Sequence, residues 1–209
     1  MWSGRSFPVR DQGRQLGLNS GGPLVFAGVV SIQPQASPWS FGIKVRRVLW
    51  SFVQGTLFRW SFHNWYAWRR LLLCVFGAEL GEAARVRPSA SIEMPWNLRL
   101  GAGAVVGDGV KLYCLGRITV GRRATLSQYA HLCAGTHDYT RRSFPLVTKP
   151  IVIGEEAWVA TDAFIGPGVT VGDRAVVGAR AVVVKDVPPD MVVAGNPARV
   201  IKRRELRDA

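Results

Sequence analysis

Hydrophobic residues between positions 153 and 187 return at every sixth place. Six aliphatic residues mark this period: Ile153, Val159, Ile165, Val171, Val177 and Val183. Four places after each comes a small or branched apolar residue: Ala157, Ala163, Val169, Ala175, Ala181 and Val187. Helices repeat every 3.6 residues and strands every two, so a period of six indicates a solenoid. The pattern predicts a mainly β fold, a parallel β-helix in which three hexapeptide repeats close one triangular coil.

The aliphatic residue of each hexad should point into the coil and stack on its equivalent about 4.7–4.9 Å away in the next coil. The following residue, often Gly as at Gly154 and Gly172, lies where the chain bends and a side chain is costly. The same period runs through two earlier groups of hexads, with a slip of two residues near Ile118–Val120. Twelve hexads, or four coils, follow from this count, and we expect the first coil to begin near Arg85.

The period is interrupted once, between Leu132 and Ile153. A solenoid that carries one polar and aromatic insertion commonly uses it for function. Upstream, apolar residues recur at helical spacing and predict helices over about 43–58 and 62–77, with Ser61 as the N-cap of the second and Gly77 or Gly81 at its end. The expected divisions are an irregular arm (1–40), a Trp/Arg-rich helical segment (41–80), the β-helix (81–188, with an inserted loop at 133–152) and a basic tail (189–209).

Charge is unevenly distributed along the chain. The net charge is +13, and no Asp or Glu occurs from residue 12 to residue 78. Arginines lie there among five tryptophans: Trp39, Trp50, Trp60, Trp65 and Trp68. Two interpretations remain open for this segment. Its aromatic face caps the open end of the solenoid, or it lies on an anionic membrane surface.

The three cysteines, Cys74, Cys114 and Cys133, are widely spaced and form no CxxC pair, which favours a reducing compartment. We therefore expect a cytoplasmic protein, either free or peripheral to the inner face of the membrane. No nucleic-acid partner and no metal are expected.

Three histidines are candidates for chemistry. His63 stands among Arg and Trp in the helical segment and is interpreted as structural. His131 and His137 are six residues apart and should therefore lie on different sides of the triangle. His137 comes where the insertion begins, and an imidazole titrates near the pH at which a general base works. Spacing alone leaves His137 open as a catalytic base or a polar turn residue, and Cys133 is interpreted as a packing residue.

Several motifs together resemble a known family. The chain resembles the hexapeptide-repeat acyltransferases, whose fold is a left-handed β-helix. This resemblance rests on the hexads, the run Gly135-Thr136-His137-Asp138 and the ending Ala194-Gly195-Asn196-Pro197-Ala198. More narrowly, the chain resembles the colanic acid biosynthesis acetyltransferases. This narrower resemblance rests on the Trp/Arg-rich helices, on Pro95-Trp96-Asn97-Leu98 and on Leu132-Cys133. The resemblance covers about residues 41–204. It implies transfer of an acetyl group from acetyl-CoA to a sugar hydroxyl of an exopolysaccharide precursor, by a homotrimer with active sites between subunits.

The resemblance also assigns roles to residues. It makes His137 the general base and gives His131 no catalytic counterpart. An oxyanion donor is implied near Val159-Ala160-Thr161. Acetyl-CoA is implied to contact Trp158, Ala160, Thr161, Ala179 and Lys185, and its 3′-phospho-ADP end to meet Lys202, Arg203 and Arg204. A trimer contact for Trp158 and a solvated role for the basic tail remain the alternatives.

The expected acceptor loop contains Asp138, Tyr139, Arg141 and Arg142. Related sugar acetyltransferases often carry an acidic residue in this loop, but residues 139–149 contain none. This difference favours an acidic sugar or a phosphate-bearing, lipid-linked acceptor.

Three alternatives remain. A different small hydroxyl acceptor fits the same site. A zinc hydratase of related fold needs three coil histidines, where this chain has two. A non-catalytic scaffold at a membrane would retain the fold alone.

Overall fold

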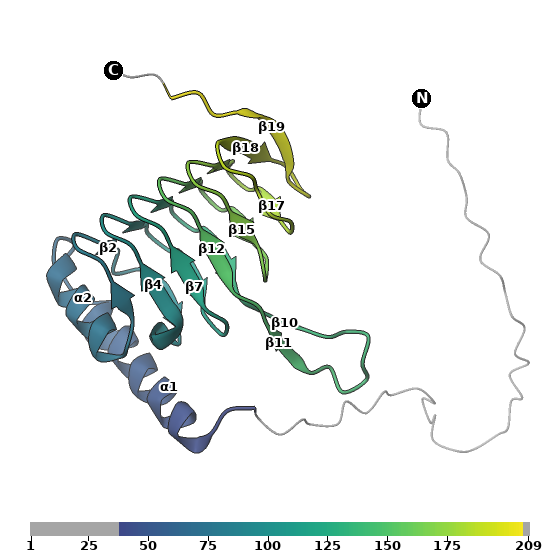
Figure 1. Cartoon of the computed structure of the whole chain (residues 1–209). Helices are drawn as coiled ribbons and strands as arrows, with labels where there is room; N and C mark the ends of the chain where they lie inside the picture. The colour runs from purple at the N-terminus through teal and green to yellow at the C-terminus, as the bar shows by residue number, and fades with distance from the viewer. Residues whose placement is uncertain (1–37, 207–209) are drawn as a thin grey trace, which may run out of the picture. The chain divides into compact units, whose positions relative to one another are not determined.

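The computed structural model describes residues 38–206, which form a parallel β-helix with helices at one end (Figure 1). Three sheets, here called A, B and C, make its three sides, and their strands are parallel except for the last strand of sheet B. Sheet A contains β1 (Glu79–Leu80), β4 (Leu98–Leu100), β7 (Ile118–Val120), β12 (Ile151–Ile153) and β15 (Thr170–Val171). Sheet B contains β2 (Arg85–Val86), β5 (Val105–Val106), β8 (Thr125–Leu126), β13 (Trp158–Val159), β16 (Val176–Val177), β18 (Met191–Ala194) and β19 (Arg199–Arg203). Sheet C contains β3 (Ser91–Glu93), β6 (Lys111–Tyr113), β9 (His131–Cys133), β14 (Phe164–Ile165) and β17 (Val182–Val183).

The predicted stacking of inward aliphatic residues on their equivalents in the next coil is confirmed by the strand register. In sheet A, Leu80 lies opposite Leu100, which lies opposite Val120, and Val120 lies opposite Ile153. Leu100, Val120, Ile153 and their small partners are buried in one continuous core along the inside of the coils, and the partly buried Leu80 packs against it. No coil covers its own interior, so stability depends on stacking of neighbouring coils.

The coil count differs from the prediction. Leu80, Val86 and Ile92 lie on β1, β2 and β3 and close one further coil, so the described residues contain five coils and not four. The first coil therefore begins at Glu79, before the expected start near Arg85. The step from Leu80 to Leu100 is 20 residues, two more than three hexads, and Leu100 to Val120 repeats it. The two-residue slip is thus a property of both early coils.

A column of glycines stacks along the corner that follows sheet A. Its members are Gly81, Gly101, Gly121, Gly154 and Gly172. A Cβ at any of them would lie 2.4–2.6 Å from a backbone nitrogen of the next coil. Ordinary carbon contacts are about 3.5–4.0 Å, so close approach of neighbouring backbones excludes a side chain here. This confirms the expectation that a side chain is costly at the bend.

The helical segment consists of α1 (Phe41–Val53), the π-helical turn η1 (Gln54–Phe58) and α2 (Tyr66–Val75). Ser40 caps α1 through the N–H of Ile43. The predicted second helix starts too early, and the prediction of Ser61 as its N-cap is wrong. Ser61 donates its hydroxyl to the carbonyl of Phe58, so this serine closes the turn before α2. The left-handed Gly77 (φ +86) follows α2 as expected.

The C-terminal residues do not form a free tail. β18 continues sheet B beside β16, and β19 turns back antiparallel to β18.

The expected irregular arm over residues 1–40 falls mainly outside the described residues. A 3₁₀ turn, η2 (Pro95–Asn97), lies between β3 and β4. No helix among residues 38–206 has the length and hydropathy needed to span a membrane.

Candidate active site

The insertion between the third and fourth coils is a β-hairpin that projects from the β-helix (Figure 1). Its strands are β10 (Gly135–His137) and β11 (Leu146–Thr148), paired antiparallel with His137 opposite Leu146. The base is anchored because Lys149 donates its N–H to the carbonyl of Ala134, 3.1 Å away. Gly135 packs so closely on Leu115 that a Cβ there would lie 2.9 Å from its side chain. The hairpin therefore leaves the corner between sheets C and A in a fixed direction.

His137 is held by two contacts with Phe144, across the hairpin. Its Nδ1 lies 2.8 Å from the Phe144 carbonyl oxygen, and the two rings stack at 4.5 Å with a 7° angle between their planes. A carbonyl oxygen only accepts, so Nδ1 carries the hydrogen and Nε2 of the neutral ring keeps its lone pair. The imidazole is exposed, so this lone pair can take a proton from a bound hydroxyl.

Phe144 was not singled out from the sequence. It has a left-handed backbone (φ +46), which is uncommon for an aromatic residue. This conformation turns its carbonyl back to His137. The only sequence signal is an aromatic residue seven positions after the histidine.

The residues of the expected acceptor loop have different environments. Asp138 accepts hydrogen bonds from the hydroxyl and N–H of Thr140, and Arg141 lies 3.3 Å away. These hydrogen bonds, with the charge of Arg141, lower the pKa of Asp138. Asp138 thus shapes the loop, whereas Tyr139 and Arg142 are exposed at its tip.

Most residues expected to bind acetyl-CoA lie on the last two coils. Trp158 projects outward from sheet B and donates its indole N–H to the Ser127 hydroxyl, 2.9 Å away. Ala160 is buried directly after β13, and Thr161 is half-buried in the next turn. Ala179 is exposed in the turn one coil further on.

Lys185 lines a cavity of about 260 Å³ between the last coil and β19. Arg199 also lines it, together with Val183, Val184, Asp186, Val187, Val193, Ala198 and Val200. This places two cations beside a mostly aliphatic hollow.

The three basic residues near the C-terminus do not form one cluster. Lys202 and Arg203 are exposed and adjacent on β19, so their side chains leave opposite faces of the strand. Arg204 is engaged elsewhere, because one terminal nitrogen donates to the carbonyls of Glu156 (3.0 Å) and Arg174 (2.8 Å). Arg204 therefore fastens the end of the chain to the turns after sheet A.

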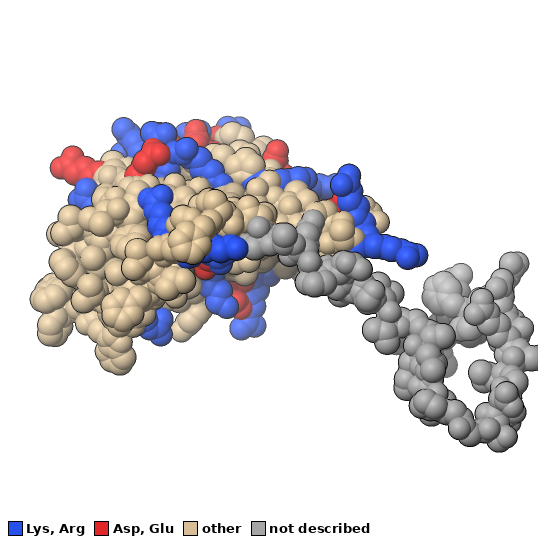
Figure 2. Space-filling model, turned by 90° about the horizontal axis from the view of Figure 1, so that it is seen from below, with Lys and Arg blue, Asp and Glu red and all other residues tan. Residues whose placement is uncertain are grey.

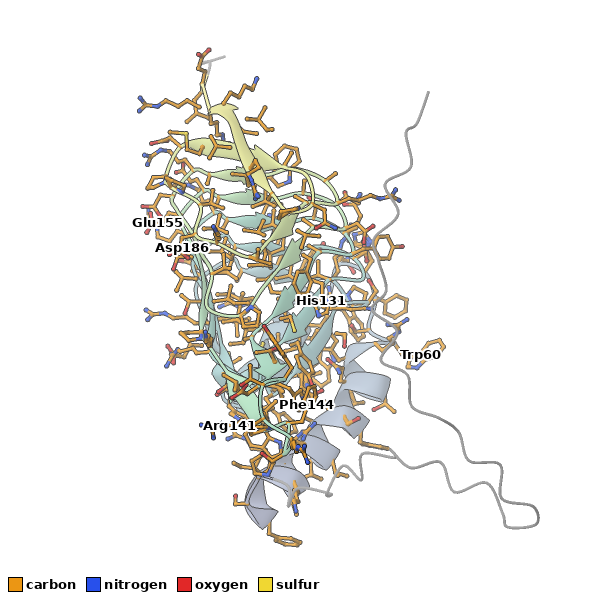
Figure 3. The ribbon with its side chains drawn as sticks, turned by 90° about the vertical axis from the view of Figure 1, so that its right-hand side faces the viewer. Trp60, His131, Arg141, Phe144, Glu155 and Asp186 are labelled. Carbon is orange, nitrogen blue, oxygen red and sulfur yellow. The ribbon has the colours of Figure 1, made fainter. Side chains whose placement is uncertain are left out.

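Within one chain, the hairpin that carries His137 lies apart from the turn of the last coil that carries Lys185. Figure 3 shows Phe144 and Arg141 on the hairpin, well separated from Asp186 beside Lys185. His131 lies on β9 with its ring edge-on to Phe164 at 5.3 Å.

The other candidate residues have structural surroundings. His63 contacts Arg87, and its carbonyl accepts a hydrogen bond from Arg69. The Cys133 thiol donates to the carbonyl of Gly135 at 3.2 Å. Within residues 38–206 no three His, Cys, Asp or Glu side chains gather as a group that could hold a metal.

Comparison with known proteins identifies the family. A sequence model described as "Bacterial transferase hexapeptide (six repeats)" matches residues 150–185. The "Putative colanic acid biosynthesis acetyltransferase WcaF" of Escherichia coli (strain K12) is 49% identical over 163 residues, which are 78% of this chain and 90% of that protein. The chain belongs to the hexapeptide-repeat acetyltransferases. The family resemblance seen in the sequence is thereby confirmed.

Solved structures of hexapeptide-repeat acetyltransferases support the assignment of the fold. One from Vibrio cholerae, complexed with acetyl-CoA, has a TM-score of 0.73 and 28% identity, and the match covers 82% of this chain and 93% of that one. A galactoside acetyltransferase in complex with coenzyme A has a TM-score of 0.72 and 26% identity, and the match covers 81% of this chain and 86% of that one. The fold is the left-handed parallel β-helix.

Proposed function

We propose that this hexapeptide-repeat acetyltransferase moves an acetyl group from acetyl-CoA to a sugar hydroxyl of an exopolysaccharide precursor, with His137 as general base. The observation that carries the proposal is the hydrogen bond from His137 Nδ1 to the Phe144 carbonyl, because it fixes the tautomer in which Nε2 accepts a proton. The likeness to WcaF supports a precursor of the colanic acid kind.

In the proposed reaction, Nε2 of His137 takes the proton from the acceptor hydroxyl as that oxygen attacks the thioester carbonyl carbon. The tetrahedral intermediate then collapses, the carbon–sulfur bond breaks, and the imidazolium returns the proton to the CoA sulfur. A positioned general base contributes about 10²–10⁴-fold in rate. A backbone N–H near Ala160 is the proposed donor to the oxyanion.

The separation of His137 from Lys185 fits a site shared between subunits. A homotrimer would place the hairpin of one subunit against the outer sheets of its neighbour, where Trp158 and Thr161 lie. Lys202 and Arg203 are the proposed contacts for the 3′-phospho-ADP end of CoA. Arg204 is left out of the proposed site because its guanidinium is bound to backbone carbonyls.

The charge of the hairpin favours an anionic acceptor. Arg142 is exposed at its tip, and Arg141 is paired only with Asp138 at the surface, where an ion pair is worth about 0–1 kcal/mol. A phosphate or carboxylate of the acceptor competes easily for such a cation. We propose an acidic or phosphate-bearing sugar, free or lipid-linked.

The test measures CoA thiol released from acetyl-CoA with a panel of neutral and anionic sugar acceptors. His137→Asn should lower kcat at least about a hundredfold. His131→Asn is the matched control, because His131 lies on β9 in the wall of the β-helix and not on the hairpin. This variant should retain activity. Equal activity of wild type and His137→Asn would contradict the assignment of the base.

Calorimetric titration with CoA distinguishes an acetyltransferase that lacks its acceptor from a non-catalytic scaffold. Binding of CoA without turnover on any acceptor would point to an acceptor outside the panel, whereas absence of binding would favour the scaffold.

A further inference from the structure

The outer face of the helical segment is exposed and apolar. Twelve of the 22 large hydrophobic side chains exposed among the described residues belong to positions 41–75. We call them the aromatic face: Phe41, Val45, Val48, Leu49, Phe52, Leu57, Trp60, Phe62, Trp65, Trp68, Leu71 and Val75. Figure 2 shows this end of the molecule, where tan side chains prevail and blue ones are few. Exposed apolar patches of such extent mark interaction sites.

The same segment also caps the solenoid, but with other side chains. Trp50 and Phe58 are buried, and the indole of Trp50 donates to the carbonyl of Ile92 in the first coil at 2.6 Å. Leu72 and Leu73 of α2 are buried as well. Capping therefore accounts for the inner face and leaves the aromatic face without a partner among the described residues.

A buried arginine fixes the turn that presents part of this face. Arg69 is fully buried and donates to the carbonyls of Val86 (2.7 Å), Phe62 (2.8 Å) and His63 (2.7 Å). The hydroxyl of Ser61 also accepts from it at 2.8 Å. Because these bonds hold the carbonyls of Phe62 and His63 and the Ser61 hydroxyl, the Phe62 ring, 69% exposed, is presented by a rigid support.

The tryptophans of this face surround a hollow. Trp60, Trp65 and Trp68 line a cavity of about 340 Å³ together with Leu57, Thr56 and Ser61. Trp60 is 84% exposed, although a tryptophan is among the side chains that gain most from burial. Indole rings of this kind prefer the boundary between acyl chains and headgroups.

Charge decides between a lipid surface and a second copy of the chain. Residues 41–78 contain no acid and six cations; Arg69 is buried and Arg47 is paired with Glu93, which leaves Lys44, Arg46, Arg59 and Arg70. Two such faces would oppose like charges, which is unfavourable for self-association. Anionic headgroups instead attract basic residues, at about 1 kcal/mol for each residue near the surface.

We propose that the aromatic face docks this protein on the surface of an anionic lipid bilayer. Trp60, Phe62 and Trp65 enter the interface, while Lys44 and Arg59 remain at headgroup level. The segment lies on the bilayer and does not cross it. Docking is independent of catalysis by His137.

The experiment is flotation of the whole protein with vesicles of phosphatidylglycerol and phosphatidylcholine in equal parts, against vesicles of phosphatidylcholine alone. Wild type should float with the anionic vesicles at low salt, less at high salt, and weakly with the neutral ones. The variant Trp60→Ser/Phe62→Ser should bind at least about tenfold more weakly. Both side chains are exposed, so its circular dichroism and its CoA binding should match wild type.

Tyr129→Asn is the matched control. Tyr129 is an exposed aromatic residue on the β-helix, and asparagine tolerates its left-handed backbone (φ +62). This variant should bind vesicles like wild type. Absence of wild-type binding to anionic vesicles, or equal binding by Trp60→Ser/Phe62→Ser, would overturn the proposal. A change of oligomeric state in Trp60→Ser/Phe62→Ser, seen by light scattering without any effect on flotation, would assign the face to a second copy.

Discussion

Replacement of Gly121 by alanine tests whether the coils are stacked as tightly as the structure indicates. Gly121 follows Val120 of β7, at the corner after sheet A. A methyl group there would lie 2.6 Å from both the nitrogen of Glu155 and the carbonyl carbon of Gly154. This is roughly 1 Å short of an ordinary contact. The Gly121 N–H also donates to the Ile153 carbonyl at 2.7 Å, so the coils cannot separate without weakening that bond.

The expected cost follows from these contacts. Overpacking costs about 1–3 kcal/mol, and a weakened hydrogen bond adds about 1 kcal/mol. Alanine also reduces the conformational freedom of the unfolded chain, which offsets about 0.4–1 kcal/mol of the lost stability. A net loss of about 2–3 kcal/mol should lower Tm by roughly 5–10 °C in a chain of this size.

Gly166→Ala is the matched control. Gly166 also follows an inward aliphatic residue, Ile165, but at the corner after sheet C. Its Cβ would lie 3.3 Å from the Val183 carbonyl oxygen and 3.7 Å from the nearest side chains. The Tm of the Gly166→Ala variant should differ from that of wild type by less than about 3 °C. Both variants are compared by thermal unfolding at the same protomer concentration, since assembly shifts apparent stability. A Tm for Gly121→Ala as high as that of Gly166→Ala would refute the close-approach argument.

Three further predictions concern single side chains. Phe144→Ala removes the ring stacked on His137 and keeps the carbonyl, so kcat should fall twofold to tenfold with little change in KM, because a stacked pair is worth about 0.5–1.5 kcal/mol; steady-state kinetics measure this, and unchanged kcat would refute a positioning role. Burial lowers the pKa of His131 below its ordinary 6.5. The unfolded chain therefore binds a proton more readily as pH falls below that value, and urea unfolding should show stability declining from neutral to mildly acidic pH, less steeply in His131→Gln. Burial raises the pKa of the Cys114 thiol, so a thiol-reactive dye should label exposed Cys74 in the native protein and Cys114 only after unfolding, as peptide mapping would show.

The period of six predicts the interior of the coils because it reports one repeated physical requirement, an aliphatic side chain facing inward. It fails where the requirement is met with a different rhythm. Leu80, Val86 and Ile92 keep the step of six, but they form a single coil, and the two-residue excess before Leu100 separates this coil from the next hexads. Met191–Ala194 is a short valine-containing strand beyond Pro188 and Pro189, and nothing local distinguishes it from a tail.

The site is less predictable from sequence than the fold. The position of His137 at the insertion follows from the interrupted period. Its orientation does not, since it depends on the left-handed backbone of Phe144. The basic run at 202–204 is uniform in sequence, but Lys202 and Arg203 belong to β19, whereas Arg204 follows it and donates to two backbone carbonyls. Of the two open interpretations of the Trp/Arg segment, capping of the solenoid describes the inner face, to which Trp50 belongs, and membrane contact of the outer face stays a proposal.

The corner between sheets C and A absorbs all variation in coil length. The steps along sheet A are 20, 20, 33 and 18 residues, so this corner holds two, two, fifteen and no residues beyond three hexads. The register of the stacked strands is the same on either side of each excess. This corner is consequently a grafting point. A segment that recognises another acceptor can replace residues 138–143 there, between His137 and Phe144, without altering any inward-facing position of the coils, so acceptor recognition and the scaffold can diversify separately.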